Sequence, residues 1–403
     1  MPDFPYQTKA VTYPRGFRAA GARGGLKEAG PDVALIVADA PCAAAAVFTT
    51  NLVVAAPVVV SREHLSRGPI RAVAVNSGCA NAVTGEQGFA DARRMAAIAA
   101  DAVGCAPEQI LVCSTGVIGH PLPLDKVETG ICAAAAALVS EDDADAAKAI
   151  MTTDTRPKTV TADVPLSGGV SARIGGMCKG SGMIAPNMAT MLGFMTTDAA
   201  IDAGALQRAL SHAVRHTFNA VTVDGDTSTN DTLLLMASGA AGNQTIVAGT
   251  EDFEVFQNVL TAACDSLARQ IAWDGEGATK LVIVDVRGAG SEAGAVRIAR
   301  TIAESPLTKT ALFGNDPNWG RVLAAAGRAG VPFDPSKAEL RIGSVTLLRD
   351  GEPTDFDAAH ASAQIARDEV EIVLNLHGGP GRAVMYTCDF SYDYVRINAE
   401  YHT

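Results

Sequence analysis

The chain has 403 residues, of which 48% are hydrophobic and 19% charged. A chain of this length and composition buries a large core, so we expect two packed lobes or one large layered domain, not a disordered protein. The formal net charge of −12, without clustered Lys and Arg, argues against a nucleic-acid partner, because phosphate binding depends on such clusters.

The first ten residues, MPDFPYQTKA, lack the basic start and apolar run of a signal peptide. The most apolar stretch, residues 40–60, is interrupted by Pro41, Asn51 and Pro57, which argues against a membrane-spanning helix. The eight cysteines include no C-x-x-C pair. Together these features predict a cytoplasmic protein with reduced thiols and no membrane partner.

Short β-rich runs alternate with alanine-rich helical stretches along the chain. Hydrophobic periodicity and turn residues predict strands at 33–39, 55–61, 70–76 and 109–116, helices at 88–104, 205–218 and 251–275, and strands at 280–288 and 369–379. No repeat and no Pro- or Ser-rich linker is present. The pattern predicts a mixed α/β architecture in which helices cover sheets, and it leaves the topology open.

Five polar, glycine-containing segments follow predicted strands or helices. They are NSGCANA (76–82), CSTGVIG (113–119), VDGDTSTNDT (223–232), WDGEGATK (273–280) and GNDPNWGR (314–321). Any one of them, taken alone, is better interpreted as a glycine turn. Because functional sites are usually built on such loops, the five together indicate a site.

Three common kinds of site are disfavoured. His212 and His216 have i, i+4 spacing but no further metal ligands nearby, so a helix surface is the better interpretation. The segment GGMCKGSG (175–182) lacks the spacing of a phosphate-binding loop. Cys79 and Cys113 have no histidine near them in sequence, which favours buried packing over a nucleophilic role.

Thr190 lies in a methionine-rich, glycine-flanked stretch, KGSGMIAPNMATMLGFMTTDA (179–199). A threonine hydroxyl needs a base to act as a nucleophile, and its own α-amino group can serve once the preceding peptide bond is cut. The α-amino pKa of roughly 8 suits that role. On these features alone, a threonine in a packed loop remains the simpler interpretation.

Several motifs resemble the ornithine acetyltransferase family, the bifunctional glutamate N-acetyltransferases of arginine biosynthesis. KGSGMIAPNMATML is similar to the family's self-cleavage motif, and NSGCANA, CSTGVIG, MTTDT, DGDTSTNDT, DGEGATK, GNDPNWGR and the terminal YVRINAEYHT match in order. The resemblance implies an α/β/β/α layered fold like that of N-terminal-nucleophile hydrolases. It also implies a cut between Ala189 and Thr190, giving an α chain (1–189) and a β chain (190–403) that assemble as α2β2.

The resemblance further implies a reaction and a set of site residues. An acetyl group would move from N-acetylornithine to glutamate through an acetyl-threonine on Thr190, and acetyl-CoA is used as a further donor by some members. No metal and no other cofactor is implied. The implied oxyanion hole is formed by Thr115 and Gly116. The implied substrate pocket is lined by Thr153, Lys179, Thr190, Glu276, Asn398 and Thr403.

Two alternatives remain open at this stage. An N-terminal-nucleophile aminopeptidase or amidase on a related scaffold would share the self-cleavage but pass the acyl group to water. A non-enzymatic binding or scaffold protein would need no cleavage at all.

Overall fold

The computed structural model describes residues 4–185 and 191–400. It divides into two compact units, which are described separately. The large unit comprises residues 5–219 and 226–267. The small unit comprises residue 4, residues 220–225 and residues from 268 onward. Within the described residues, no helix is long and apolar enough to cross a membrane.

The large unit is built on one eight-stranded sheet with the order β4-β3-β2-β8-β7-β6-β5, in which β1 also pairs with β2. The strands are β1 (Phe17–Ala22), β2 (Val33–Phe48), β3 (Ile70–Cys79), β4 (Ile110–Val117), β5 (Lys158–Pro165), β6 (Ser171–Lys179), β7 (Leu192–Thr197) and β8 (Thr232–Ala237).

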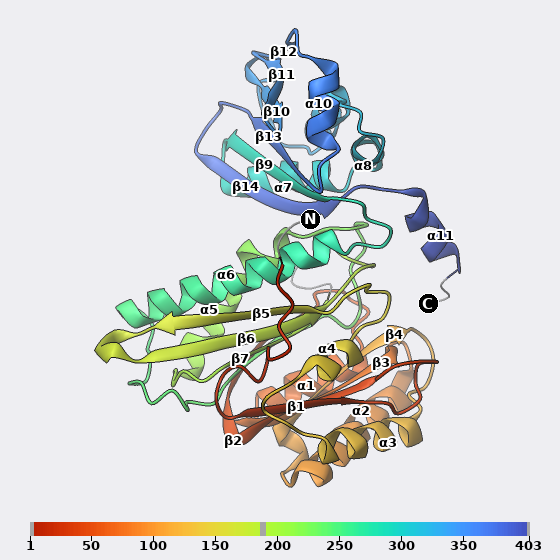
Figure 1. The fold of residues 1–403 in the computed structure, drawn as a ribbon, viewed down its shortest axis with the longest axis vertical. Coiled ribbons are helices and arrows are strands. Elements are labelled where there is room, and N and C mark those ends of the chain that lie inside the picture. The colour runs from red at the N-terminus through yellow and green to blue at the C-terminus, as the bar shows by residue number, and fades with distance from the viewer. Residues whose placement is uncertain (1–3, 186–190, 401–403) are drawn as a thin grey trace. The chain divides into compact units, whose positions relative to one another are not determined.

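The long strand β2 folds this sheet into two layers (Figure 1). Its first part pairs with β3 as far as Val37, and its second part, from Ala43, pairs with β8. The register jumps between Val37 and Cys42, where residues 39–41 are exposed. The two layers face each other across a core in which Ile36 and Leu111 of one layer share a cluster with Phe194 and Met236 of the other.

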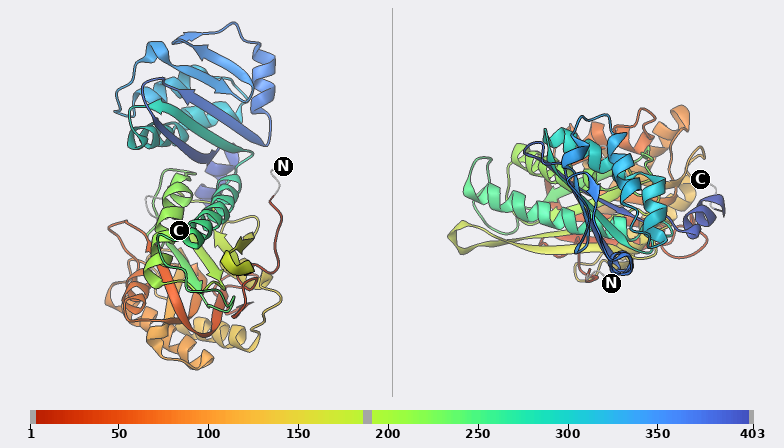
Figure 2. Two further views of the ribbon diagram at one scale, coloured as in Figure 1. Left: turned by 90° about the vertical axis from the view of Figure 1, so that its left-hand side faces the viewer. Right: turned by 90° about the horizontal axis from the view of Figure 1, so that it is seen from above.

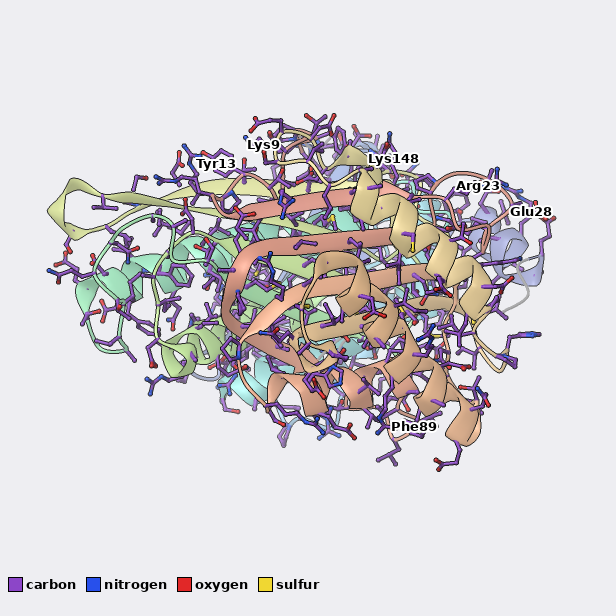
Figure 3. All side chains as sticks on the ribbon, turned by 90° about the horizontal axis from the view of Figure 1, so that it is seen from below. Lys9, Tyr13, Arg23, Glu28, Phe89 and Lys148 are labelled. Atoms are coloured by element: carbon purple, nitrogen blue, oxygen red, sulfur yellow. The ribbon has the colours of Figure 1, made fainter. Side chains whose placement is uncertain are left out.

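Helices cover the outer faces of both layers. The helices of this unit are α1 (Ala56–Leu65), α2 (Gly85–Val103), α3 (Leu124–Ala136), α4 (Ala144–Ala149), α5 (Ala203–His216) and α6 (Glu251–Trp273), the last continuing into the small unit. Leu35 and Val37 point to the face opposite Ile36 and pack with Met95 of α2 and Ile131 of α3, as alternation along a strand requires. Figure 3 shows helices lying across this face, with Phe89 of α2 labelled.

The second layer is covered by α5 and α6 (Figure 1). Gln207 of α5 accepts a hydrogen bond from Ala46 N and donates one to Ala46 O, both at 3.1 Å. The turn of the β5–β6 hairpin is tied to α6, because the Ser167 backbone N–H and hydroxyl donate to Asp252 at 2.8 and 2.7 Å. Figure 2 shows the hairpin running alongside that helix. The order helix, sheet, sheet, helix confirms the predicted layered α/β fold.

Most predicted elements are present, and one is wrong. Residues 55–61, predicted as a strand from their valines, begin helix α1 instead. Pro57 lies in the first turn, where its missing N–H costs no helical hydrogen bond. Ser61 and His64, three residues apart, face the sheet and bond the carbonyls of Val112 and Ile110, both at 2.7 Å. The predicted helix at 205–218 corresponds to α5, and the exposed positions of His212 and His216 confirm the helix-surface interpretation.

The small unit contains a six-stranded sheet with the order β12-β11-β10-β13-β9-β14. Its strands are β9 (Leu281–Ala289), β10 (Glu339–Ile342), β11 (Val345–Arg349), β12 (Glu352–Pro353), β13 (Glu369–Asn375) and β14 (Gly381–Cys388). Its other helices are α7 (Glu292–Ala303), α8 (Pro306–Phe313), α9 (Trp319–Gly327), α10 (Ala358–Ile365) and α11 (Tyr392–Glu400). Val284 and Ile372 of the sheet share one core cluster with Ile298 of α7.

Candidate active site

Thr115 and Gly116 lie at the carboxyl end of β4, beside the parallel end of β3. Gly116 has φ +129, and a Cβ built there would lie 2.4 Å from the carbonyl carbon of Gly78. Only glycine fits, so the two strand ends approach backbone to backbone. A buried hydrogen bond, which Ser114 Oγ donates to Asn76 Oδ1 at 2.6 Å, fixes these two strand ends. A rigid loop at a strand end can hold donors in a preset direction.

Lys179, the last residue of β6, brings a cation to this loop. Its Nζ donates to Thr115 Oγ1 at 3.4 Å, and the residue is only 8% exposed. The structure thus joins two of the predicted site residues from strands 64 positions apart in the chain. A hydroxyl next to a nearly buried ammonium can stabilise negative charge that develops on a substrate oxygen atom.

Asp154 organises the neighbouring loop, a role that the sequence analysis missed. Its Oδ1 accepts hydrogen bonds from Lys158 Nζ and Gly180 N, both at 2.7 Å, and its Oδ2 accepts one from Thr152 N at 3.0 Å. Burial by itself would raise the pKa of this carboxyl, but the charges of Lys158 and Lys179 and these hydrogen bonds outweigh burial and lower it. Asp154 is therefore ionised, and it holds the half-buried Thr153 and the end of β6 in place.

Asn230 connects the start of β8 to the same strand ends. Its Nδ2 donates to Ala80 O at 2.6 Å and to Ser114 O at 2.9 Å. The motif that contains Asn230 was noted in the sequence, but no role was given to it. A buried amide among hydroxyl residues just before an apolar strand is the signal that could have identified it.

The predicted cleavage point, Ala189–Thr190, lies outside the described residues, but both flanking strands are described. Lys179 pairs with Leu192 across β6 and β7, and Leu192 pairs with Thr232 across β7 and β8. The chain therefore leaves the sheet after Lys179 and rejoins it at Leu192, at the same end of these strands. Lys179 contacts Thr115 at that end.

In the small unit, the structure joins two further predicted residues. Asn398 Nδ2 on α11 donates to Glu276 Oε2 at 2.8 Å. Glu276 is 7% exposed and lies in the loop between α6 and β9. That loop is held to the start of α11 because Ser391 Oγ donates to Gly277 O at 2.5 Å. Thr403, the remaining predicted residue, lies outside the described residues.

The two candidate cysteines are buried, as expected of packing residues. Burial raises the pKa of Cys113 to about 12 and also raises the pKa of Cys79. A thiol with a raised pKa holds little of the reactive thiolate at neutral pH. The interpretation of Cys79 and Cys113 as packing residues is confirmed.

These contacts indicate an enzyme that stabilises an oxyanion. Buried hydrogen bonds hold together a glycine-containing strand end, a threonine hydroxyl and a nearly buried lysine, and such an arrangement can stabilise an oxygen that gains negative charge.

Comparison with known proteins identifies the family. The ArgJ family model matches residues 18–403, and the chain belongs to this family. Curated relatives named "Arginine biosynthesis bifunctional protein ArgJ" include one from Symbiobacterium thermophilum, 53% identical over 98% of each chain. A second, from Lactococcus lactis, is 47% identical over 97% of this chain and 98% of the relative.

A solved structure gives the same result. The crystal structure of the arginine biosynthesis bifunctional protein ArgJ from Bacillus halodurans is 48% identical, with a TM-score of 0.52, and covers 53% of this chain and 100% of its own. The family membership confirms the expectation of an acetyltransferase of arginine biosynthesis. The aminopeptidase alternative is not favoured.

Proposed function

We propose that this protein transfers an acetyl group from N-acetylornithine to glutamate through an acetyl ester on Thr190. Acetyl-CoA acts as a second acetyl donor, as a substrate and not as a cofactor, and no metal takes part. The observation that carries this proposal is the contact of Lys179 with Thr115. Lys179 ends β6 and pairs with Leu192 of β7, so the segment that contains Thr190 connects these two paired residues.

Self-cleavage after Ala189 supplies the nucleophile. It divides the protein into an α chain (1–189) and a β chain (190–403). Residues 190–403 are 214 of the 403 residues, or 53%, and the complete Bacillus halodurans chain covers the same share of this protein. That agreement supports the division. The freed α-amino group of Thr190 then accepts the proton of the adjacent hydroxyl.

Acetyl transfer passes twice through a tetrahedral oxyanion. The Thr190 hydroxyl attacks the acetyl carbonyl of N-acetylornithine, and ornithine leaves. The amine of glutamate then attacks the acetyl ester, which frees Thr190. Thr115 and Gly116 act as oxyanion donors in both steps, with Lys179 next to Thr115 adding positive charge. Because both donor and acceptor use Thr190, the substrates bind in turn.

Substrate recognition rests on a cation and an acid. Both substrates carry an α-carboxylate, with which Lys179 pairs, and Glu276 pairs with the free α-amino group of glutamate and of released ornithine. Asn398 holds Glu276 Oε2. The family resemblance also assigns Thr153, Asn398 and Thr403 to substrate binding, and their neutral side chains suit substrate side chains of either charge.

The two chains remain associated after the cut. Strand β7, on the β-chain side, pairs with β6, and β8 pairs with β2, so one sheet contains strands of both chains. We place the product in the cytoplasm as an α2β2 assembly.

Incubation of the purified protein with each donor tests the function. N-acetylornithine alone adds one acetyl group to the chain that begins at Thr190, as measured by mass spectrometry, and later addition of glutamate yields N-acetylglutamate. Acetyl-CoA with glutamate gives the same product. Release of acetate without acetylglutamate would instead support a hydrolase.

A further inference from the structure

Lys27 is a half-buried cation to which the mechanism above gives no role. It lies in the loop between β1 and β2, where Arg23 and Glu28 are exposed (Figure 3). Its Nζ turns inward and donates to the backbone carbonyl of Met151 at 3.0 Å, across 124 positions of the chain. Among the described residues, Lys27 makes no ion pair and no second side-chain hydrogen bond. Because lysine usually keeps its charged end in water, a lysine that points at one distant carbonyl has a specific task.

The backbone that carries Lys27 is fixed by Asp32. This residue is completely buried, and its carboxylate accepts hydrogen bonds from four consecutive backbone N–H groups, those of residues 24–27. The Asp32 carbonyl also accepts a hydrogen bond from Ser77 N at 2.9 Å, which fastens the loop to the end of β3. Lys27 therefore extends from a rigid support, as a residue that orients a functional site must.

The stem of Lys27 packs on the strand end that lies against Gly116. A Cβ built at Gly78 would lie 3.3 Å from Lys27 Cγ, and a Cβ built at Gly116 would lie 2.4 Å from the carbonyl carbon of Gly78. Lys27 thus contacts Gly78 on one side, and Gly116, the proposed oxyanion donor, contacts Gly78 on another.

The charged end of Lys27 holds the segment that contains Thr153. Lys27 Nζ bonds the carbonyl of Met151, and Thr152 N donates to Asp154 Oδ2 at 3.0 Å. The half-buried Thr153 therefore has an anchored residue on each side. Through its stem and its charged end, Lys27 connects this segment to the strand end at Gly116.

We propose that Lys27 is a positioning residue that keeps Thr153 at a fixed place relative to the oxyanion donor Gly116. This inference rests on the proposed function, in which Thr153 contacts substrate. The reacting centre at the oxyanion donors and the amino-acid group at Thr153 belong to one bound substrate, so both contacts are made at full strength only if their separation is constant. N-acetylornithine and glutamate bind in turn at the same pocket, so the binding of both depends on Lys27.

Lys27→Met removes the ammonium but keeps an unbranched apolar side chain that packs on Gly78. We expect the KM for both substrates to rise roughly tenfold, since one hydrogen bond from a charged group is lost. The kcat should change little, as it does when a mutation weakens substrate binding and transition-state binding equally. Lys27→Arg keeps a charged donor and should retain most of the affinity. Both variants should melt close to the wild type.

Lys148→Met is the matched control. Lys148 lies on α4, three residues before Met151, and its exposed side chain pairs with Asp145 at 3.1 Å. This variant loses the same charge close to the same segment, but no contact with Met151 O. We expect it to leave both KM values unchanged.

A double-mutant cycle separates positioning from an independent contact. Thr153→Ala should raise the KM by itself, and adding Lys27→Met to it should cause little further rise, because the effects of residues that act through one another are not additive. Fully additive effects, or a wild-type KM in Lys27→Met, overturn the positioning role alone. A wild-type KM in Thr153→Ala overturns the assignment of Thr153 and this inference with it. A wild-type protein that transfers no acetyl group from N-acetylornithine to glutamate overturns the proposed function itself.

Lys27→Gln covers the case in which Lys27→Met does not fold. Its side chain is one atom shorter than that of lysine and falls short of Met151 O, but its amide stays hydrated at this half-buried position. We expect the same rise in KM and faster hydrogen exchange of the backbone amides in residues 150–155, which Lys148→Met should not show. A wild-type KM with wild-type exchange in this variant overturns the proposal.

Discussion

Lys158 Nζ lies 2.7 Å from Asp154 Oδ1, and both side chains are completely buried. Removing one partner of such a pair leaves an uncompensated charge in the interior. We expect Asp154→Asn to lower the free energy of unfolding by about 3–5 kcal/mol, as measured by chemical denaturation. The exposed pair Lys148–Asp145, at 3.1 Å, supplies the control, and Asp145→Asn should cause no comparable loss.

The same pair predicts a dependence on pH. The pKa of Asp154 is lower in the folded protein than the unfolded value of about 3.9. Its contribution to stability is therefore complete above pH ~4 and declines as the pH falls toward the folded pKa. Below pH ~4, the stability difference between wild type and Asp154→Asn should shrink. A difference that stays constant down to acid denaturation would contradict the lowered pKa.

Thr115→Ala should slow acetyl transfer by ~10²–10³, because it removes one oxyanion donor. Thr115→Ser keeps the hydroxyl next to Lys179 and should retain most of the activity. Steady-state rates of the cleaved proteins with N-acetylornithine and glutamate provide the measurement. Wild-type turnover in a folded, fully cleaved Thr115→Ala protein would exclude the role.

Glu276→Gln should reduce acetyl transfer while leaving the fold unchanged. The glutamine still accepts a hydrogen bond from Asn398 Nδ2, so only the charge is lost. Glu352→Gln, at an exposed position of the small unit, is the matched control. If acetyl transfer by the cleaved Glu276→Gln protein stays within about a factor of two of wild type, the proposed ammonium contact is wrong.

Deletion of residues 401–403 tests the assignment of Thr403 to the pocket. We expect the KM for both substrates to rise while the melting temperature remains close to that of the wild type, because terminal residues rarely carry much stability. Unchanged KM values would place the C-terminus outside the pocket.

Thr190→Ala should give one uncut chain of about 41.4 kDa that folds but is inactive. Thr190→Ser keeps the hydroxyl but loses the β-methyl that restricts its rotamers, so it should cleave more slowly and transfer acetyl less well. Intact mass measurement of the wild type should show two chains, the second beginning at Thr190. Cleavage at another bond, or activity in Thr190→Ala, would refute the mechanism.

Local pattern was sufficient for most of the helices and strands. Strand residues 33–37 alternate between two cores, and the long helix at 251–273 repeats its apolar face over several turns. The prediction for the segment 55–61 was wrong because its valines favour a strand locally. The hydrogen bonds of Ser61 and His64 that orient the helix are made to a strand about 50 residues further along the chain. The bend in β2, which creates the two layers, has no comparable local signal.

The sequence by itself determined the family, the reaction class and the residues expected to perform it, because motifs are runs of neighbouring residues that can be matched in order. Only the tertiary structure showed that Lys179 contacts Thr115, that Asn398 donates to Glu276, and that Asp154 and Asn230 hold the neighbouring backbone. Those relationships depend on burial and on strand register. Burial decides whether a carboxyl is ionised, and register decides which distant residues become neighbours, and neither is encoded by any short stretch of sequence.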